Sequence, residues 1–251
     1  MPCFANSQLS NPTPGTNIMQ QVLGRRNGAA TFVLVHGAWA GAWAWTRVID
    51  RLTANGHHIH APTLSGLGER SHLAGCNINL TTHVNDIVNE IKWKDLDQIV
   101  LVGLSYGGLV ITGVAEQVGE RIASIVYVDA FVPANGQSFA DITGWHPAGE
   151  MIAPPPAPEG TYVNEADRAW INSKTTPQPI ATLTEKLRVT GAYQRVPKKT
   201  YIQATGWAGP FDAPAAAARS DRSWTVYDIA CGHDVPNHKP DELTAILEAS
   251  I

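Results

Sequence analysis

The sequence has few cysteines, little net charge and no long hydrophobic run. Its 251 residues include three cysteines, which are scattered and odd in number, so neither a disulfide framework nor a zinc ligand set is indicated. The formal net charge of -4 lacks the basic excess that nucleic-acid or anionic-membrane binding favours. No apolar run approaches the ~20 residues of a membrane span, and the N-terminal region lacks the apolar core of a secretory signal. We therefore expect a cytoplasmic protein with neither a nucleic-acid nor a membrane partner.

Apolar segments that read as strands alternate with segments of helical periodicity along most of the chain. The length lies within the range that single α/β domains reach, so one domain is predicted. The expected strands are nearly continuous in apolar residues, which is typical of a parallel sheet covered by helices on both faces. They are TFVLVH, HHIHAP, QIVLVG, SIVYVDAFV, KTYIQAT and SWTVYDI. The sequence therefore predicts an α/β fold with a mostly parallel central sheet flanked by helices.

Two segments depart from this alternation. Residues 1–30 are rich in helix and strand breakers and are predicted to form an N-terminal arm without a catalytic role. Residues from about 131 to 197 include the Pro-rich stretch HPAGEMIAPPPAPEGTY, and their helical signals around 164–172 and 180–190 are short. A linker between two domains would also be Pro-rich, but too few strand–helix units follow it to make an independent domain. We predict one domain over 31–251, with a helical and Pro-rich lid inserted at about 131–197.

A serine between glycines follows the apolar segment QIVLVG. The stretch Gly103 to Gly107, GLSYG, has the Gly-x-Ser-x-Gly spacing of a nucleophile elbow, in which a sharp strand-to-helix turn lifts the serine hydroxyl clear of the sheet. The expected strand before it and helix after it are the context that this mechanism requires. Attack by Ser105 on a carbonyl would need two preorganised N–H donors for the oxyanion. Tyr106 is expected to supply one backbone N–H, and Ala38, in the HGAW loop after the first clear strand, the other.

Activation of the serine requires a histidine as general base and an acidic residue that orients the histidine. In folds with this type of elbow the three residues follow in the order serine, acid, histidine, so the base is expected to be a histidine late in the chain. His233, in the stretch CGHDVP after the last expected strand, fits that order best. His238 is the nearer rival, but its place at the start of the last helix favours a solvated capping role. The other histidines considered are predicted to be structural, surface or packing residues rather than metal ligands: His36, His57, His58 and His60.

Two aspartates compete for the role of the acid. Asp129 ends the expected strand IVYVD, where a carboxylate can face the catalytic loops. Asp212, in GPFDAP, follows the next expected strand. Both satisfy the chain order of the triad, and a helix cap or turn role is the alternative for either one. Asp234 adjoins His233 and is expected to point away from it.

Four stretches of the chain carry a family resemblance: FVLVHGAWAGAWAWTRVIDRLTANGHHIHAPTLSGLGERSHL, VLVGLSYGGLVITGVA, IVYVDAFVPANGQS and GHDVPNHKPDEL. They resemble the α/β-hydrolase superfamily and, within it, the compact bacterial esterases related to plant methylesterases and hydroxynitrile lyases. The likeness covers residues 32 to about 139 and 199 to the end. It implies a Ser–His–Asp triad, and the match to bacterial relatives in YVDAFVP favours Asp129 over Asp212. Leu104 departs from the Gly-His-Ser that is usual in these families, which removes an imidazole near the elbow.

The triad chemistry implies a serine hydrolase that cleaves a small carboxylic ester through an acyl-enzyme on Ser105. An apolar or aromatic ester is favoured, and carbamates or related acyl groups are a natural extension. Neither a cofactor nor a metal is required. Three aromatic residues expected near the mouth of the site are candidates for binding this small-molecule substrate, although packing alone would also explain them: Trp39, Trp145 and Trp207. The protein is expected to be a monomer or a homodimer.

Two other functions stay open at this level. A hydroxynitrile-lyase-like C–C lyase would use related residues without acylation, but the resemblance to that family calls for Thr after His-Gly and Lys after the catalytic His. This chain has Ala38 and Asp234 at those positions. A non-catalytic receptor for a small ligand is the second alternative, since folds do not fix functions.

Overall fold

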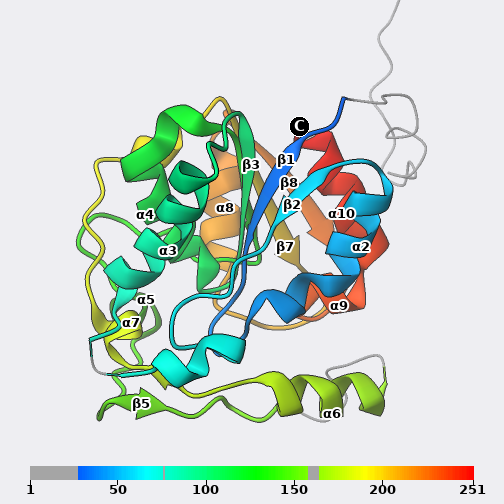
Figure 1. Cartoon of the computed structure of the whole chain (residues 1–251). Coiled ribbons are helices and arrows are strands. Elements are labelled where there is room, and N and C mark those ends of the chain that lie inside the picture. The colour runs from blue at the N-terminus through cyan, green and yellow to red at the C-terminus, as the bar shows by residue number, and fades with distance from the viewer. Residues whose placement is uncertain (1–27, 76, 158–163) are drawn as a thin grey trace, which may run out of the picture.

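The computed structural model describes residues 28–75, 77–157 and 164–251. Its centre is a parallel sheet of six strands in the order β2-β1-β3-β4-β7-β8 (Figure 1). The strands are β1 Thr31–Val35, β2 His58–His60, β3 Ile99–Leu104, β4 Ile122–Val128, β7 Lys198–Ala204 and β8 Trp224–Ile229. The predicted fold class is therefore confirmed. The predicted N-terminal arm falls almost entirely outside the described residues.

Each central strand supplies side chains to two apolar layers. In β1, Val33 and Val35 pack into the layer under one set of helices, whereas Phe32 and Leu34 pack under the other set. This alternation follows from the two-residue period of a strand, and it requires apolar residues on both faces of the sheet. The first layer is covered by α3 Leu80–Trp93, α4 Gly107–Val118 and α8 Asp212–Ser220, and the second by α2 Thr46–Ala54 and α10 Pro240–Ala249 (Figure 1).

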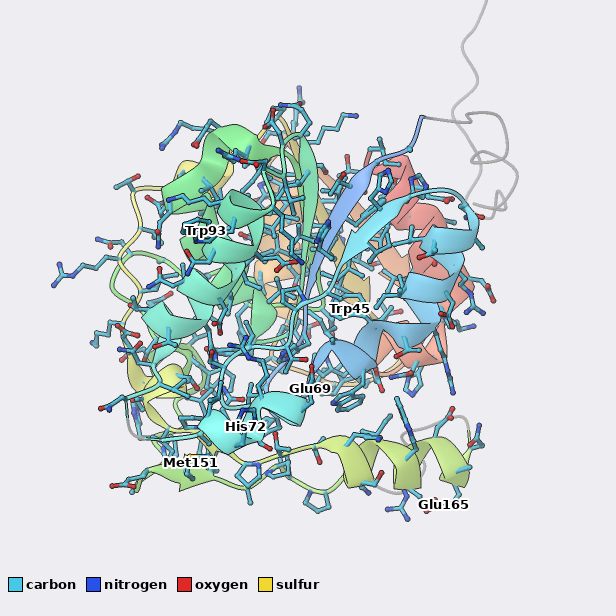
Figure 2. The ribbon with its side chains drawn as sticks, viewed as in Figure 1. Trp45, Glu69, His72, Trp93, Met151 and Glu165 are labelled. Carbon is cyan, nitrogen blue, oxygen red and sulfur yellow. The ribbon has the colours of Figure 1, made fainter. Side chains whose placement is uncertain are left out.

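The helix α3 shows how the local sequence sets an element. It begins at a capping box, in which Asn79 Oδ1 accepts the backbone N–H of Thr82 at 2.9 Å and Thr82 Oγ1 accepts that of Asn79 at 3.3 Å. At the other end of α3, Trp93 is 84% exposed, whereas Trp45 is fully buried in the second layer (Figure 2). Trp93 and Trp45 therefore lie in different environments, one at the surface and one in the core.

The chain between β4 and β7 leaves the sheet and returns to the neighbouring position. Its elements are α5 Phe139–Thr143, β5 Met151–Ile152, α6 Glu165–Lys174, β6 Gln178–Pro179, α7 Ala181–Thr184 and the 3-10 helix η4 Ala192–Arg195. Figure 1 shows β5 and α6 lying across one end of the sheet. The helix predicted around 180–190 is shorter than expected: it ends at Thr184, because Leu187 pairs in a bridge with Gln137 and draws the chain into an extended conformation.

The loops that follow the parallel strands gather at one edge of the sheet. Those after β1, β2 and β8 continue into the short helices η1 Ala42–Trp45, η2 Gly68–Leu73 and α9 Val235–His238. The 3-10 helix η3 Gly119–Arg121 instead joins α4 to β4. Because carboxyl ends of parallel strands meet at the same edge, segments far apart in sequence converge there. Within the described residues, no helix combines the length and apolarity needed to cross a membrane.

Candidate active site

Ser105 occupies a strained turn between β3 and α4. Its φ of 55° lies in the left-handed region, which is costly for a residue with a side chain. Backbone hydrogen bonds hold it there: its N–H donates to Val128 O at 3.2 Å, and its carbonyl accepts from Phe131 N at 3.2 Å and Gly108 N at 3.0 Å. Both ends of this turn are thus anchored to β4 and the residues that follow it. This is the geometry that a nucleophile elbow needs.

Gly107 allows the elbow to pack against β1. A Cβ atom at this position would lie 2.7 Å from Val35 O and 2.9 Å from His36 O, distances that real side chains do not adopt. The glycine therefore lets the first turn of α4 approach the neighbouring strand directly. The second glycine of the GLSYG pattern is a steric requirement of the fold rather than a coincidence of composition.

Asp129 lies buried behind His233. His233 Nδ1–H donates to Asp129 Oδ2 at 2.7 Å, and the carboxylate is only 1% exposed. Two further donors complete its shell: the backbone N–H of Ala204 binds Oδ1 at 3.1 Å and the indole N–H of Trp207 binds Oδ2 at 2.9 Å. A buried carboxylate is stable only when such donors replace water. Because Nδ1 carries the proton, Nε2 of the neutral imidazole has a free lone pair and can accept a proton.

Aromatic rings fix the plane of the imidazole. The ring of His233 stacks on that of Phe211 with centroids 5.0 Å apart and an interplanar angle of 11°. The ring of Trp207 packs against that of His233 at a centroid distance of 4.8 Å, tilted by 40°. The side chain of His233 is still 32% exposed, so it is reachable from the cavity. Stacking and the Asp129 hydrogen bond together leave the ring little rotational freedom.

The other two aspartates make different contacts. Asp212 is exposed at the start of α8, where its Oδ1 accepts from Gln203 Nε2 at 2.7 Å. Asp234 accepts from Asn237 Nδ2 with both oxygens, at 3.0 and 2.9 Å, and burial raises the pKa of its carboxyl. Of the two candidate acids, the structure brings Asp129 and not Asp212 to His233.

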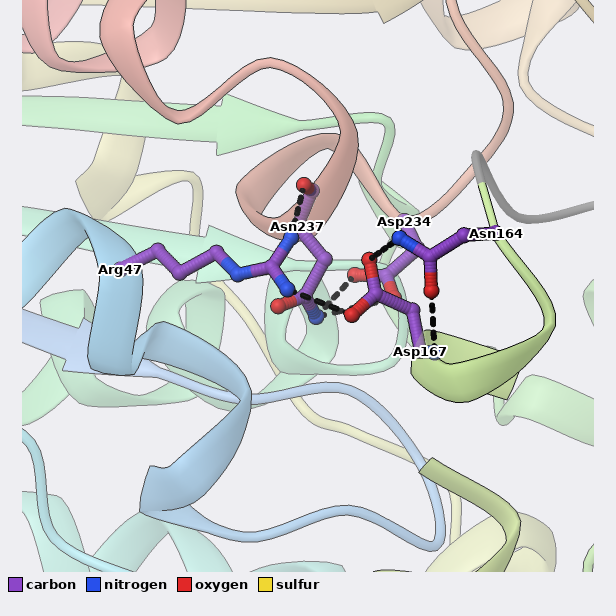
Figure 3. A network of polar contacts seen from close by, with 5 residues as sticks. All are labelled: Arg47, Asn164, Asp167, Asp234 and Asn237. Atoms are coloured by element: carbon purple, nitrogen blue, oxygen red, sulfur yellow. Dashed lines mark hydrogen bonds and ion pairs between the residues drawn. The ribbon is translucent and has the colours of Figure 1, made fainter. Parts of the chain in front are cut away.

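Asp234 also belongs to a polar network that ties the insertion to the core (Figure 3). Arg47 of α2 donates to Asn237 O at 2.8 Å and to Asp167 Oδ1 of α6 at 2.6 Å. Asn164 caps the same helix, accepting the backbone N–H of Asp167 at 2.8 Å. Because α2 and α9 belong to the core, this network fixes α6 over the end of the sheet.

The HGAW loop lies directly against the elbow. A Cβ atom on Gly37 would be 3.2 Å from Ser105 Cβ. His36 is fully buried; its Nδ1–H donates to Gly37 O at 2.8 Å and its Nε2 accepts the backbone N–H of Leu64 at 3.0 Å. Burial lowers the pKa of His36 to about 4, so the ring is neutral. Since Gly37 C=O and Ala38 N–H share one trans peptide, this bond orients the N–H of Ala38.

Tyr106 places its backbone N–H directly after the serine, at the start of α4. Its hydroxyl is buried and donates to His83 Nδ1 at 2.9 Å, while His83 Nε2–H donates to Ser65 O at 2.9 Å. Burial lowers the pKa of His83 to about 4 as well. Within the described chain, the backbone N–H groups of Ala38 and Tyr106 donate to no other protein group. Both are therefore available to an oxyanion.

A cavity of about 730 Å³ opens over Ser105 and His233. Trp39 and Trp207 line it as expected, whereas Trp145 is not among its lining residues and lies beside Trp39, with ring centroids 6.3 Å apart. Several further lining residues were not predicted from the sequence: Trp43, Pro154, Pro155, Pro156, Ile171, Asn172 and Thr175. The Pro-rich run was a signal only for the three prolines, and it did not indicate where they would lie. Nearby Cys231 offers no competing nucleophile, because burial raises the pKa of its thiol to about 12.

Comparison with known proteins agrees with this arrangement. A model of the alpha/beta hydrolase family matches residues 32–246. The chain belongs to this family. A carbendazim hydrolyzing esterase of Nocardioides sp. (strain SG-4G) is 38% identical to this hydrolase over 240 residues, which cover 88% of the chain and 99% of the relative. Methylesterase 2 of Arabidopsis thaliana is 30% identical over 138 residues, covering 54% of the chain and 50% of that relative.

Solved structures extend the same result. An extracellular alpha/beta-hydrolase from a Paenibacillus species matches with a TM-score of 0.75 at 27% identity, covering 88% of this hydrolase and 98% of that chain. The resemblance inferred from the four sequence stretches is thus confirmed. Among the activities that this fold supports, ester hydrolysis is the one that the relatives favour.

Proposed function

We propose that this hydrolase is a serine esterase in which Ser105 is the nucleophile, His233 the general base and Asp129 the acid. The observation that carries the proposal is that Ser105 and His233 line one cavity while the buried Asp129 accepts a 2.7 Å hydrogen bond from His233. The carboxylate holds the imidazole in the tautomer whose Nε2 faces away from it, and it stabilises the imidazolium that forms.

The reaction would proceed in two halves. Ser105 Oγ attacks the carbonyl carbon of the ester while His233 Nε2 takes the hydroxyl proton. The backbone N–H groups of Ala38 and Tyr106 stabilise the resulting oxyanion. Collapse breaks the bond to the leaving alcohol, which receives the proton from His233, and leaves an acyl-enzyme on Ser105. A water molecule then attacks the acyl carbon while His233 Nε2 takes its proton. Collapse breaks the bond to Ser105 Oγ, which receives that proton, and the carboxylic acid departs.

The cavity favours a compact, largely apolar acyl or alcohol group. Its volume of about 730 Å³ falls within the range of small-molecule sites, and its walls include the rings of Trp39, Trp43 and Trp207. Carbendazim, after which the Nocardioides esterase is named, is an aromatic methyl carbamate, so methyl esters and methyl carbamates of flat aromatic groups are the proposed substrates. Trp39 and Trp207 are the proposed substrate contacts, whereas the proposal does not use Trp145.

The lyase alternative lacks support in the site. The position after His233, where the resemblance to lyases calls for a cation, holds Asp234, whose carboxylate binds Asn237. Ala38 offers a backbone N–H but no hydroxyl at the second position. Backbone N–H donors are sufficient to stabilise the oxyanion of ester hydrolysis.

The proposed function is tested with a fluorophosphonate probe, p-nitrophenyl acetate and an aromatic methyl carbamate. We expect a single adduct on Ser105 in the wild-type protein, and loss of both the adduct and hydrolysis in Ser105→Ala and His233→Ala. The matched controls are Ser71→Ala and His72→Ala, which change the same residue types at exposed positions and should keep full activity. A folded wild-type protein that takes no label and hydrolyses neither substrate would refute the esterase assignment.

A further inference from the structure

The backbone of Trp39, the residue after the proposed oxyanion donor Ala38, is strained. Its φ is 59°, in the left-handed region that bulky residues avoid. Such a conformation is costly and persists only where surrounding contacts over-determine it. The contacts that hold Trp39 in place therefore bear on the geometry of the oxyanion hole.

Those contacts come from the insertion, far away in the sequence. Gln178 Oε1 accepts the backbone N–H of Trp39 at 2.7 Å, and the backbone N–H of Thr176 donates to Trp39 O at 3.0 Å. Both backbone polar groups of Trp39 are thus bound by one short stretch around β6. The side chain of Gln178 is inaccessible to solvent, so water does not replace it as the acceptor.

The hydrogen bonds around Gln178 define which way its amide points. Thr182 Oγ1 lies 2.7 Å from Pro179 O, and because a carbonyl only accepts, the hydroxyl donates there. Thr182 Oγ1 must then accept from Gln178 Nε2, which lies 2.7 Å away. With its nitrogen committed to Thr182, Gln178 presents its carbonyl oxygen to Trp39. Reversing the amide would break both bonds.

We propose that Gln178 is a positioning residue for the oxyanion hole. The inference rests on the proposed esterase function and deepens it. His36 holds the Gly37–Ala38 peptide, which carries the donor N–H, and Gln178 holds the following Ala38–Trp39 peptide, so both peptide planes that meet at Ala38 are fixed. Without an acceptor at position 178, the Ala38–Trp39 peptide turns to relieve the strain at Trp39. This rotation shifts the Cα atom of Ala38, which also belongs to the Gly37–Ala38 peptide, and so moves the Ala38 N–H relative to that of Tyr106. The insertion thereby completes the catalytic machinery as well as covering the cavity.

The test uses Gln178→Met, which keeps the length of the side chain but removes the acceptor. We expect kcat for p-nitrophenyl acetate to fall on the order of 10-fold to 100-fold, with KM within about twofold, because only transition-state stabilisation is weakened. The inhibition constant of an aryl trifluoromethyl ketone, whose adduct with Ser105 carries an oxyanion, should rise by the same factor. Gln117→Met, an exposed change on α4, is the matched control and should alter neither value.

A second variant keeps the test decisive if Gln178→Met does not fold. Thr182→Val removes the hydroxyl that orients the Gln178 amide, and we expect a smaller fall in kcat, again with a matching rise in the inhibition constant. Unchanged kcat and unchanged inhibition in a folded Gln178→Met protein, or in Thr182→Val where Gln178→Met does not fold, would overturn the assignment. A wild-type protein without Ser105-dependent hydrolysis would instead refute the proposed function itself.

Discussion

Acidification should destabilise this hydrolase through two buried histidines. His36 and His83 are neutral in the folded protein, each with one nitrogen donating and the other accepting, and burial lowers the pKa of both to about 4 from 6.5. In the unfolded chain both titrate near the ordinary value. Well above pH 6.5 neither state binds the proton and the free energy of unfolding is unaffected. Between pH 6.5 and about 4 only the unfolded state binds it, so stability falls as pH falls.

The size of the effect follows from the two pKa values. Each histidine lowers the free energy of unfolding by about 1.4 kcal/mol per pH unit inside that window. For the two together, the loss between about pH 7 and pH 5.5 is about 2.5 kcal/mol. A domain stability of roughly 5–15 kcal/mol makes this a measurable fraction of the total.

Urea denaturation at several pH values across this interval measures the slope. His83→Gln and His36→Gln should each reduce the pH dependence by about half, whatever they do to stability at pH 7. His72→Gln, at an exposed position, should leave the slope as in the wild type. A wild-type free energy of unfolding that stays constant over the interval, or a slope unchanged in both buried-histidine variants, would refute this reasoning.

Three further predictions concern the site. Asp129→Asn should lower kcat on the order of 10⁴-fold in an esterase assay, whereas Asp212→Asn leaves it unchanged; the reverse result would assign the acid to Asp212. Gly107→Ala should lower the free energy of unfolding by about 1–3 kcal/mol in denaturant titrations because its methyl group meets two backbone oxygens. Gly119→Ala, with nothing within 4 Å, serves as its control, and equal losses would contradict the steric argument. Trp207→Phe keeps the ring on His233 but removes a donor to Asp129, so kcat/KM should fall on the order of 10-fold; full activity would show that the indole N–H is dispensable.

Much of the architecture could be predicted from the sequence because local sequence patterns determine it. The apolar strands and the GLSYG turn each follow from residues within a few positions of one another. Local sequence did not decide whether Asp129 or Asp212 is the acid, since both residues follow strands and both satisfy the chain order of the triad. The choice depends on sheet order and side-chain direction: β4 lies next to β3, while Asp212 begins α8 and faces solvent.

The contacts between the insertion and the rest of the chain could not be predicted from the sequence for a related reason. Gln178 and Trp39 are separated by 139 positions, and the two-residue strand that carries Gln178 has no periodicity to recognise. Trp145 was expected near the mouth because it falls in the insertion, but its ring packs beside Trp39 and Phe139 instead of lining the cavity. The presence of aromatic residues predicts that they are buried, but it does not predict which neighbours they pack against.

The elbow and Asp129 belong to a single strand–helix–strand unit, β3–α4–β4, and the long insertion begins only after it. The geometry of Ser105 and Asp129 is therefore set by the β3–α4–β4 unit, whereas the insertion between β4 and β7 is a separate segment that can be exchanged. Insertions from relatives could be grafted between β4 and β7 to reshape the cavity without disturbing the register of Ser105 and Asp129. Any such chimera would have to bring its own acceptor for the N–H of Trp39, so a glutamine or its equivalent facing that loop is the first thing to design into the graft.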